Sequence, residues 1–346
     1  MGIGVCVSVL VLLSACSGTT TQGSAPRRGS GGDGAVGSAG TGDPGTGGGS
    51  TIIVPPPDEM PDAGPEGGII MTLPMGYTAT DIGGYQLGEP LSGADAGSAA
   101  STPTGGTCGN ILLGVVRDFV GGTGVGQNPD FQGPLYGNNV TTGLVASLLG
   151  TDQKPVYASK CEEATVTSPM PPTCPFGPET TTKADFDQWY RYTQGVNLPF
   201  IVRLFFAPEA NGLFTFQSSL FFPLDNAGFG NTPGVTGNDG KPHNFSFTTE
   251  LHTQFKYGGG ETFTFTGDDD VWVFINGTLA VDLGGLHVPE TGSVNLDASA
   301  ATFGLSKGNT YNLDLFHAER HDPGSNFRID TNLSFVDCGV VVPDVR

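Results

Sequence analysis

The stretch FTFTGDDDVWVFINGTLAVDLGGLH (residues 263–287) decides the fold, because it reads as β-strands joined by tight turns. In VWVFINGTLAVD, two apolar runs flank Asn276 and Gly277, and Asn-Gly is the strongest short signal for a two-residue β-hairpin. FTFTG before it alternates apolar and polar residues with the period of a strand. Three consecutive carboxylates separate the strands. Like charges placed there require a cation, raised pKa values or hydrogen-bond donors.

Further strands are expected on both sides of this stretch. HNFSFTTELHTQFKY (243–257) alternates so that Phe245, Phe247, Thr249 and Leu251 share one face, and Ser246, Thr248, Glu250 and His252 share the other. Other strand segments are FIVRLFFAP, LFTFQSSLFFPL, TYNLDLFHAER and NFRIDTNLSFVD, while KADFDQWYRYTQGVN predicts a helical turn. Tight turns without crossover helices predict an all-β fold, an antiparallel β-sandwich with long loops.

Composition excludes some classes of function. The chain has 346 residues, a net charge of -20, 56 Gly and 26 Pro. Such an acidic surface repels phosphate backbones, so we expect no nucleic-acid partner. A charged fraction of only 14% suits a β-rich extracellular protein.

The N-terminus predicts export. An apolar run from Val5 to Leu13 is too short for a permanent membrane span and leads into LSAC, which resembles the bacterial lipobox. That resemblance implies cleavage before Cys16, which becomes the lipidated first residue of the mature protein, and Ser17 at the next position favours the outer membrane or cell surface. Ordinary cleavage and secretion is the alternative.

The expected organisation has four parts. After the signal peptide (1–16), residues 17–107 are rich in Gly, Ser and Thr and predict a disordered low-complexity linker with a span on the order of 50 Å. One apolar interruption, GGIIMTLPMGYTATDIGGYQLG, stays unassigned: it is either a docked strand or a merely sticky stretch. Residues 108–338 form the folded domain, and 339–346 a tail.

Besides the lipidated Cys16, four cysteines remain in the mature chain, and an even number in an exported protein predicts two disulfides. Of the three possible connectivities we favour Cys161 with Cys174, across a Pro-rich loop, and Cys108 with Cys338, which bracket the domain. A zinc site is disfavoured, since no CxxC pair is present.

Residues 109–337 closely resemble the fibro-slime domain of bacterial surface proteins and of secreted proteins of social amoebae. The segments that carry this resemblance are KPVY, FDQWYR, FFPLDNAGFGN, HNFSFTTELHTQFKY, GDDDVWVFINGTLAVDLGGLH, GSVNLD and FHAERHDPGSNFRIDT. The hairpin is also similar to a distant member of the anthrax protective antigen domain superfamily. This second resemblance implies a β-sandwich of the kind found in adhesins, toxins and glycosidases, which often binds carbohydrate.

The resemblance also implies a metal site. In lectins of that superfamily two Asp residues joined by a cis peptide bind calcium, and the pair falls on Asp268 and Asp269. Asp270 stands where the superfamily usually has Gly, and is either a third ligand or a cap on a neighbouring strand. Calcium suits such a loop because it accepts carboxylate and carbonyl oxygens in irregular geometry. The alternative is a metal-free corner in which turn amides donate to the carboxylates.

A second group of candidate residues lies near the chain's C-terminal end. On a strand, His317, Glu319 and His321 share a face, while His287 follows the hairpin. Together with Arg320 and Asn326 they predict a hydrogen-bonded and ionic network or a ligand site. A transition-metal site is the weaker alternative, because His317 and His321 on one strand lie about 13 Å apart.

No enzyme motif such as GxSxG, HExxH or a P-loop is present, so we expect a non-enzymatic protein. Trp189, Tyr190, Tyr192 and Trp272 are candidates for stacking on sugars, although burial of Trp272 is at least as plausible. The leading hypothesis is a surface lipoprotein that binds extracellular polysaccharide or matrix through calcium. The alternatives are a structural slime-matrix protein without a ligand site and, third, a polysaccharide hydrolase.

Overall fold

The computed structural model describes residues 84–91, 110–133, 139–166 and 170–339. The predicted signal peptide, the lipidation site Cys16, most of the predicted linker, Cys108 and residues 340–346 of the tail lie outside the described residues.

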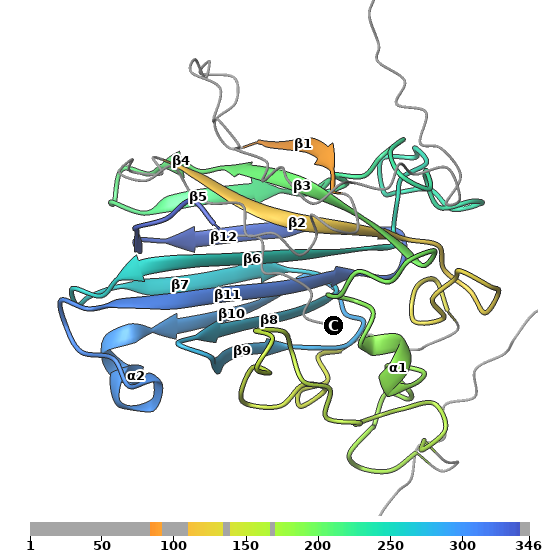
Figure 1. The fold of residues 1–346 in the computed structure, drawn as a ribbon, viewed down its shortest axis with the longest axis horizontal. Coiled ribbons are helices and arrows are strands. Elements are labelled where there is room, and N and C mark those ends of the chain that lie inside the picture. The colour runs from red at the N-terminus through yellow and green to blue at the C-terminus, as the bar shows by residue number, and fades with distance from the viewer. Residues whose placement is uncertain (1–83, 92–109, 134–138, 167–169, 340–346) are drawn as a thin grey trace, which may run out of the picture. The chain divides into compact units, whose positions relative to one another are not determined.

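Two antiparallel sheets form a sandwich, as predicted (Figure 1). The first sheet has the order β1 (Tyr85–Pro90), β3 (Asn197–Phe205), β2 (Ile111–Phe119), β6 (Phe247–Lys256), β11 (Thr310–Glu319), β8 (Asp270–Ile275) and β9 (Thr278–Leu283), and β13 (Ser334–Phe335) pairs with β6. The second sheet has the order β10 (Glu290–Asn295), β7 (Thr262–Gly267), β12 (Phe327–Thr331), β5 (Phe214–Ser218) and β4 (Ala207–Pro208).

The period-two pattern of β6 explains how the core forms. Phe247 and Leu251 pack into the main apolar cluster, together with phenylalanines from β5, β7 and β12 of the other sheet. Glu250 and His252 lie on the opposite face of β6, where they form ion pairs. The assignment of the two faces from sequence is therefore confirmed.

The β8–β9 hairpin is also confirmed. Asn276 and Gly277 have φ angles of 50° and 75°, the left-handed conformations that a two-residue turn of this type requires. Thr278 pairs with Ile275 across the turn. Strand β8 also pairs with β11, so the hairpin lies at the edge of the first sheet.

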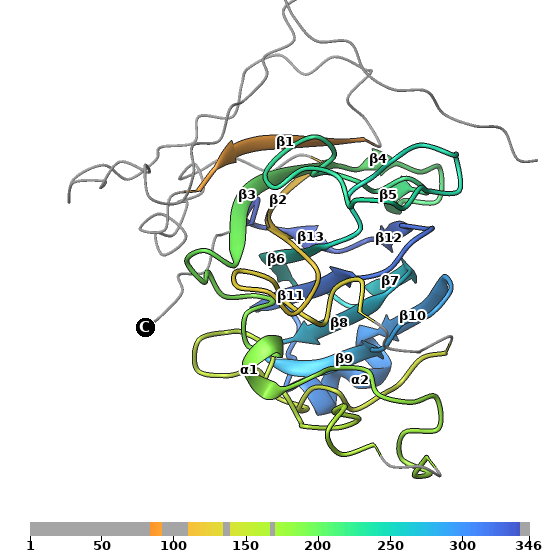
Figure 2. The same cartoon turned by 90° about the vertical axis from the view of Figure 1, so that its right-hand side faces the viewer.

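The described residues between β2 and β3 (120–133, 139–166 and 170–196) form a layer of mostly irregular structure, here called the covering layer, over the outer face of β8 and β11. It contains α1 (Lys183–Phe186), which begins at the predicted helical turn and lies beside β9 in Figure 2. Its aromatic residues pack with Trp272 and Phe316 in a second apolar cluster. Trp189, Tyr190 and Trp272 are fully buried there, so these three are not available to stack on a sugar.

One disulfide follows the predicted pairing: Cys161 and Cys174 are bonded, with their Cα atoms 5.4 Å apart. Cys338 is also disulfide-bonded, and its carbonyl accepts a hydrogen bond from the Leu113 amide at 2.6 Å. Because Cys108 lies outside the described residues, its pairing with Cys338 stays a prediction.

Strand β1 lies inside the stretch that we expected to be a linker. It pairs antiparallel with β3 at the end of the first sheet. The Tyr85 hydroxyl accepts a hydrogen bond from the Phe222 amide at 3.2 Å and donates to the Leu220 carbonyl at 3.1 Å. The apolar interruption therefore contributes a docked strand.

The second helix, α2 (Leu296–Phe303), follows β10. The Asn295 side chain caps its first turn by accepting from the Ala298 amide, and Gly304 ends it with a φ of 65°. Leu296 and Phe303 pack into the main core. Among the described residues, neither helix approaches the length and apolar content that a membrane span needs.

Candidate functional site

The three aspartates lie where the chain passes from β7 in one sheet to β8 in the other. The peptide bond between Asp268 and Asp269 is cis. Gly267 makes this crossing possible, because a β-carbon there would lie 2.2 Å from the Asn326 carbonyl oxygen. The chain from Gly267 to Asp270, here called the corner, thus packs directly against the start of β12.

Both oxygens of the Asp268 carboxylate accept hydrogen bonds from Asn326. The Asn326 amide donates to Oδ1 of Asp268, and the Asn326 side-chain nitrogen donates to Oδ2 at 2.9 Å. From the opposite side, His317 Nε2 donates to the Asp268 carbonyl oxygen at 3.0 Å. Burial raises the pKa of the Asp268 carboxyl, and the Asn326 donors oppose that change.

Asp269 is held by backbone amides. The Arg320 amide donates to its Oδ2 at 3.1 Å, and the His287 amide lies 3.4 Å from its Oδ1. Burial raises the pKa of Asp269 well above its usual range; the Arg320 charge opposes this, and the neighbouring Asp270 and Asp268 charges add to it. These contacts match the hydrogen-bonded corner that sequence offered as an alternative to calcium.

Asp270 has a different environment. It is fully buried, and its Oδ2 forms an ion pair with Arg320 Nε at 2.6 Å. Its Oδ1 accepts from the Gly285 amide at 2.6 Å, which fixes the turn after β9. Of the three aspartates only Asp270 forms an ion pair in the described structure, so its charge is already compensated, and we confine the candidate metal ligands to Asp268 and Asp269.

Arg320 connects the corner to the covering layer. Its Nη1 donates to the carbonyl oxygens of Glu179 at 2.9 Å and Asp130 at 3.3 Å. Its guanidinium carbon lies 4.7 Å from the centre of the Trp189 ring, a cation–π geometry. Burial alone would lower its pKa, but Asp270 and the other carboxylates outweigh burial and raise it.

Glu319 lies beside the aspartates and forms no ion pair in the described structure. It is 1% exposed, and neither carboxyl oxygen has a hydrogen-bond partner among the described residues. Burial raises its pKa well above the usual range, and the Asp269 and Asp268 charges raise it further; the nearby Ser325 hydroxyl and His321 amide oppose this change, although neither reaches hydrogen-bond geometry. A buried carboxyl without a donor is rare, because desolvation then has nothing to offset it.

The histidines separate into two groups. His317 and His287 are buried, and burial lowers the pKa of His317 to about 3, so this imidazole is neutral at pH 7. The ring nitrogens of His287 face the carbonyl oxygens of Leu283 and Val288 at 3.0 and 2.8 Å. His321 instead has a side chain that is 45% exposed, and its ring nitrogen Nδ1 lies near the carbonyl and carboxylate oxygens of Asp322. The network therefore forms without His321.

Sequence reasoning missed two residues at the open side of the corner. A β-carbon on Gly324 would lie 3.2 Å from Asp268 Oδ2 and 3.6 Å from the side-chain nitrogens of Asn238 and Asn326. The absence of a side chain at Gly324 thus leaves polar atoms from three segments facing one space. Asn238 is distant in sequence from the other residues, and no motif marks it.

The balance of buried charges determines which kind of ligand the corner can bind. Asp268, Asp269, Asp270 and Glu319 are buried together, and Arg320 is the cation that pairs with them in the described structure. No group of three or more His, Cys, Asp or Glu side chains in the described ranges is arranged to hold a metal ion. A cation here would instead bind the two carboxylates of Asp268 and Asp269 together with neutral oxygens. This set of oxygen donors fits calcium.

The chain is similar to several known proteins. Residues 227–342, which include the whole corner, match the family model of the PA14 domain. Protein psiQ of Dictyostelium discoideum is 37% identical over 231 residues, covering 63% of this chain and 21% of psiQ. Protein psiC of the same organism is 35% identical over 224 residues, covering 62% of this chain and 41% of psiC. The chain therefore spans only about a fifth to two fifths of the length of these relatives. Among solved structures, a PA14 sugar-binding domain from an RTX adhesin is 14% identical, covers 37% of this chain and 76% of that chain, and has a TM-score of 0.21.

Proposed function

We propose that this PA14 domain protein, related to the Dictyostelium psi proteins, is a non-enzymatic fibro-slime protein that binds extracellular carbohydrate or matrix through a calcium ion at Asp268 and Asp269. The observation that carries the proposal is the excess of buried carboxyls over cations at the corner. A divalent cation would offset this excess, and it would leave coordination positions for ligand hydroxyls on the open side, at Gly324.

The residues of the chain have distinct roles in this proposal. Asp268 and Asp269 supply the anionic oxygens, and Asn326 holds Asp268 in place through two hydrogen bonds. Arg320 and Asp270 form a fixed ion pair behind them that orients the backbone amide donating to Asp269. Bound calcium would supply a Lewis-acidic site that accepts sugar hydroxyl oxygens.

Presentation at the cell surface forms part of the proposal. Lipidation at Cys16 would anchor the chain in the outer membrane, and the Gly/Ser-rich segment would hold the sandwich away from the lipid. Support for this comes from the sequence pattern. Mass spectrometry of the mature N-terminus tests it, because an unmodified or differently cleaved end would contradict lipid anchoring.

Calcium titration tests the central claim. We expect calcium to bind the purified chain with measurable heat and, at a hundredfold excess over Kd, to stabilise it by about 2.7 kcal/mol. Asp269→Asn should abolish both effects, because it removes one of two anionic ligands. Glu163→Gln, an exposed carboxyl in the covering layer, is the matched control and should change neither.

One observation favours the structural alternative. Each oxygen of the three aspartates already accepts a hydrogen bond or ion pair from the protein. A metal-free corner in a self-associating matrix protein is consistent with this. Absence of calcium binding, a blank glycan array and sedimentation as oligomers would together support that second candidate and overturn the first.

A further inference from the structure

A long loop borders the corner on its open side. It joins β5 to β6 and comprises residues 219–246, here called the β5–β6 loop. Near the tip of the loop, the Asn238 amide donates to the Pro323 carbonyl at 3.0 Å. Pro323 precedes Gly324, so the loop rests on the turn that carries Asn326.

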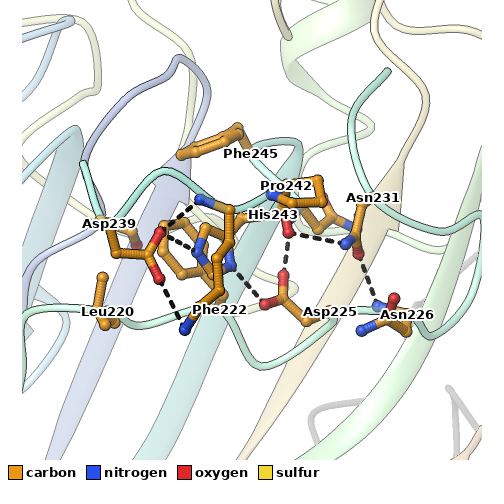
Figure 3. Close-up of polar contacts among 12 residues, drawn as sticks. Leu220, Phe222, Asp225, Asn226, Asn231, Asp239, Pro242, His243 and Phe245 are labelled. Atoms are coloured by element: carbon orange, nitrogen blue, oxygen red, sulfur yellow. Dashed lines mark hydrogen bonds and ion pairs between the residues drawn. The ribbon is translucent and has the colours of Figure 1, made fainter. Parts of the chain in front are cut away.

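An imidazole fixes the shape of this loop (Figure 3). His243 Nδ1 lies 2.5 Å from Asp225 Oδ2, and Nε2 lies 2.9 Å from Asp239 Oδ1. The ring stacks on Phe222, with ring centres 3.9 Å apart and an angle of 9° between the planes. Two carboxylates on one imidazole favour the doubly protonated ring. Burial opposes that charge, but Asp225 and Asp239 outweigh burial and raise the pKa of His243.

The base of the loop is anchored separately. Asp118 on β2 accepts from the Phe229 amide at 2.5 Å and from the Asn244 side chain at 2.7 Å. Gly228, with a φ of 56°, lets the loop approach closely, since a β-carbon there would lie 2.1 Å from Asp118 Oδ2. The loop is therefore held both at its base and near its tip.

The tip presents Asn238 to the site. A turn brings the Gly240 amide within 2.9 Å of the Gly237 carbonyl, and the Gly237 amide bonds to the Lys241 carbonyl at 2.8 Å. Asp239, which follows Asn238, is the residue that His243 holds. The Asn238 side chain is exposed and makes no hydrogen bond to a described residue. An ordered backbone thus carries an unused carboxamide beside Asp268 and Asn326.

We propose that Asn238 is a ligand-binding residue of the corner site and that the His243 clamp positions it. The assignment rests on the proposed function and specifies its ligand chemistry. Two carboxamides, from Asn238 and Asn326, can donate to hydroxyl oxygens, and Asp268 Oδ2 can accept a hydroxyl hydrogen. Converging donors and an acceptor of this kind fit a pair of adjacent hydroxyls on a sugar ring.

A glycan array with saturating calcium, combined with calorimetry using calcium alone, tests Asn238. Asn238→Ala should weaken array binding about tenfold, the loss of one good hydrogen bond, while the Kd for calcium stays within about twofold. Thr236→Ala, an exposed neighbour in the same loop, should change neither. Unchanged array binding by Asn238→Ala would overturn the role of Asn238 and leave the proposed function standing. A blank array for the unaltered chain would overturn both.

The clamp consists of His243 with Asp225 and Asp239. Its positioning role requires a measurement that a purely structural role would leave unchanged. His243→Gln should increase hydrogen exchange at the Asn238 amide and reduce array binding about as much as Asn238→Ala, with little effect on the Kd for calcium. Array binding by the unaltered chain should weaken as pH rises through the pKa of His243, while His243→Gln stays flat. The groups that face the clamp are Asp225 and Asp239, with Lys241 paired to Asp239 and Asp118 at the loop base. Array binding by His243→Gln equal to that of the unaltered chain would overturn the positioning role.

Discussion

Two clusters of buried charged side chains each include a residue of strand β11, and they differ in the balance between carboxylates and cations. At the corner, Asp268, Asp269, Asp270 and Glu319 are buried together, and Arg320 forms an ion pair with Asp270. On the outer face of the first sheet, Glu250 is bound by Arg117 at 2.5 Å, by His252 at 2.5 Å and by Lys154. His252 also pairs with Asp314 on β11 at 2.6 Å. The outer cluster has its compensating charges within the chain, whereas the corner lacks them.

The difference separates a structural role from a binding role. Burial opposes ionisation of Glu250, but Lys154, Arg117 and His252 outweigh it and hold the pKa of Glu250 well below its usual range. At the corner, burial raises the pKa values of Asp268, Asp269 and Glu319. A self-compensated cluster ties the covering layer to the sheet, while an uncompensated one retains affinity for a cation.

Removing the charge at the centre of the outer cluster has the largest expected effect. Glu250→Gln leaves Arg117 and Lys154 buried without their carboxylate, which should destabilise the protein by about 3–5 kcal/mol. Urea unfolding measures this, with and without calcium. Glu163→Gln is the control and should lie within about 0.5 kcal/mol of the unaltered chain. If calcium restored the stability of Glu250→Gln, the two clusters would not be independent.

Asp118 is an intermediate case, because amide donors rather than a cation satisfy it. Burial raises its pKa to about 8, against the lowering effects of Asn244 and the Phe229 amide. Folding then takes up a proton, so this contribution to stability is fully present below the unfolded pKa and is lost as pH rises toward about 8. Between about pH 4 and pH 8 the loss should be on the order of 2–4 kcal/mol.

Urea unfolding across that pH range measures this loss, and Asp118→Asn should flatten the profile. Asp225→Asn, at a more exposed carboxyl of the β5–β6 loop, is the comparison variant and should keep most of the slope. An unchanged slope in Asp118→Asn would mean that another group takes up the proton. Hydrogen bonds alone would then compensate a buried carboxyl about as well as cations do.

The features that could be predicted from the sequence are those that depend on residues close together in the chain. The β8–β9 hairpin depends on Asn276 and Gly277 and on an alternating pattern around them, and all of this lies within a dozen residues. The two faces of β6 follow from the same period. Candidate residues such as Asp268, Asn326 and Arg320 were identifiable from the resemblance, because they lie in its quoted segments.

The partners of these residues were not identifiable, because they depend on register and on loops. Asp270 meets Arg320 only because β8 pairs with β11 so that Ala318 faces Asp270. Asn238 reaches the corner from a loop whose path is set by His243 and Asp118, which are far apart in sequence. Long-range pairings of this kind leave no periodic signal in the chain.

Substitution of Glu319 also distinguishes the two clusters, and its expected effect on the stability of the protein is the smallest. Glu319→Gln replaces a buried carboxyl, which has no ion pair and no well-formed hydrogen bond in the described structure, with a neutral amide of the same shape. In calcium-free buffer at neutral pH this should stabilise the protein by about 1–3 kcal/mol, opposite in sign to Glu250→Gln, because a buried group without a partner carries its full desolvation penalty. Urea unfolding of both variants under identical conditions measures the contrast. Destabilisation by Glu319→Gln would show that the carboxyl is compensated after all, and the corner would then resemble the outer cluster.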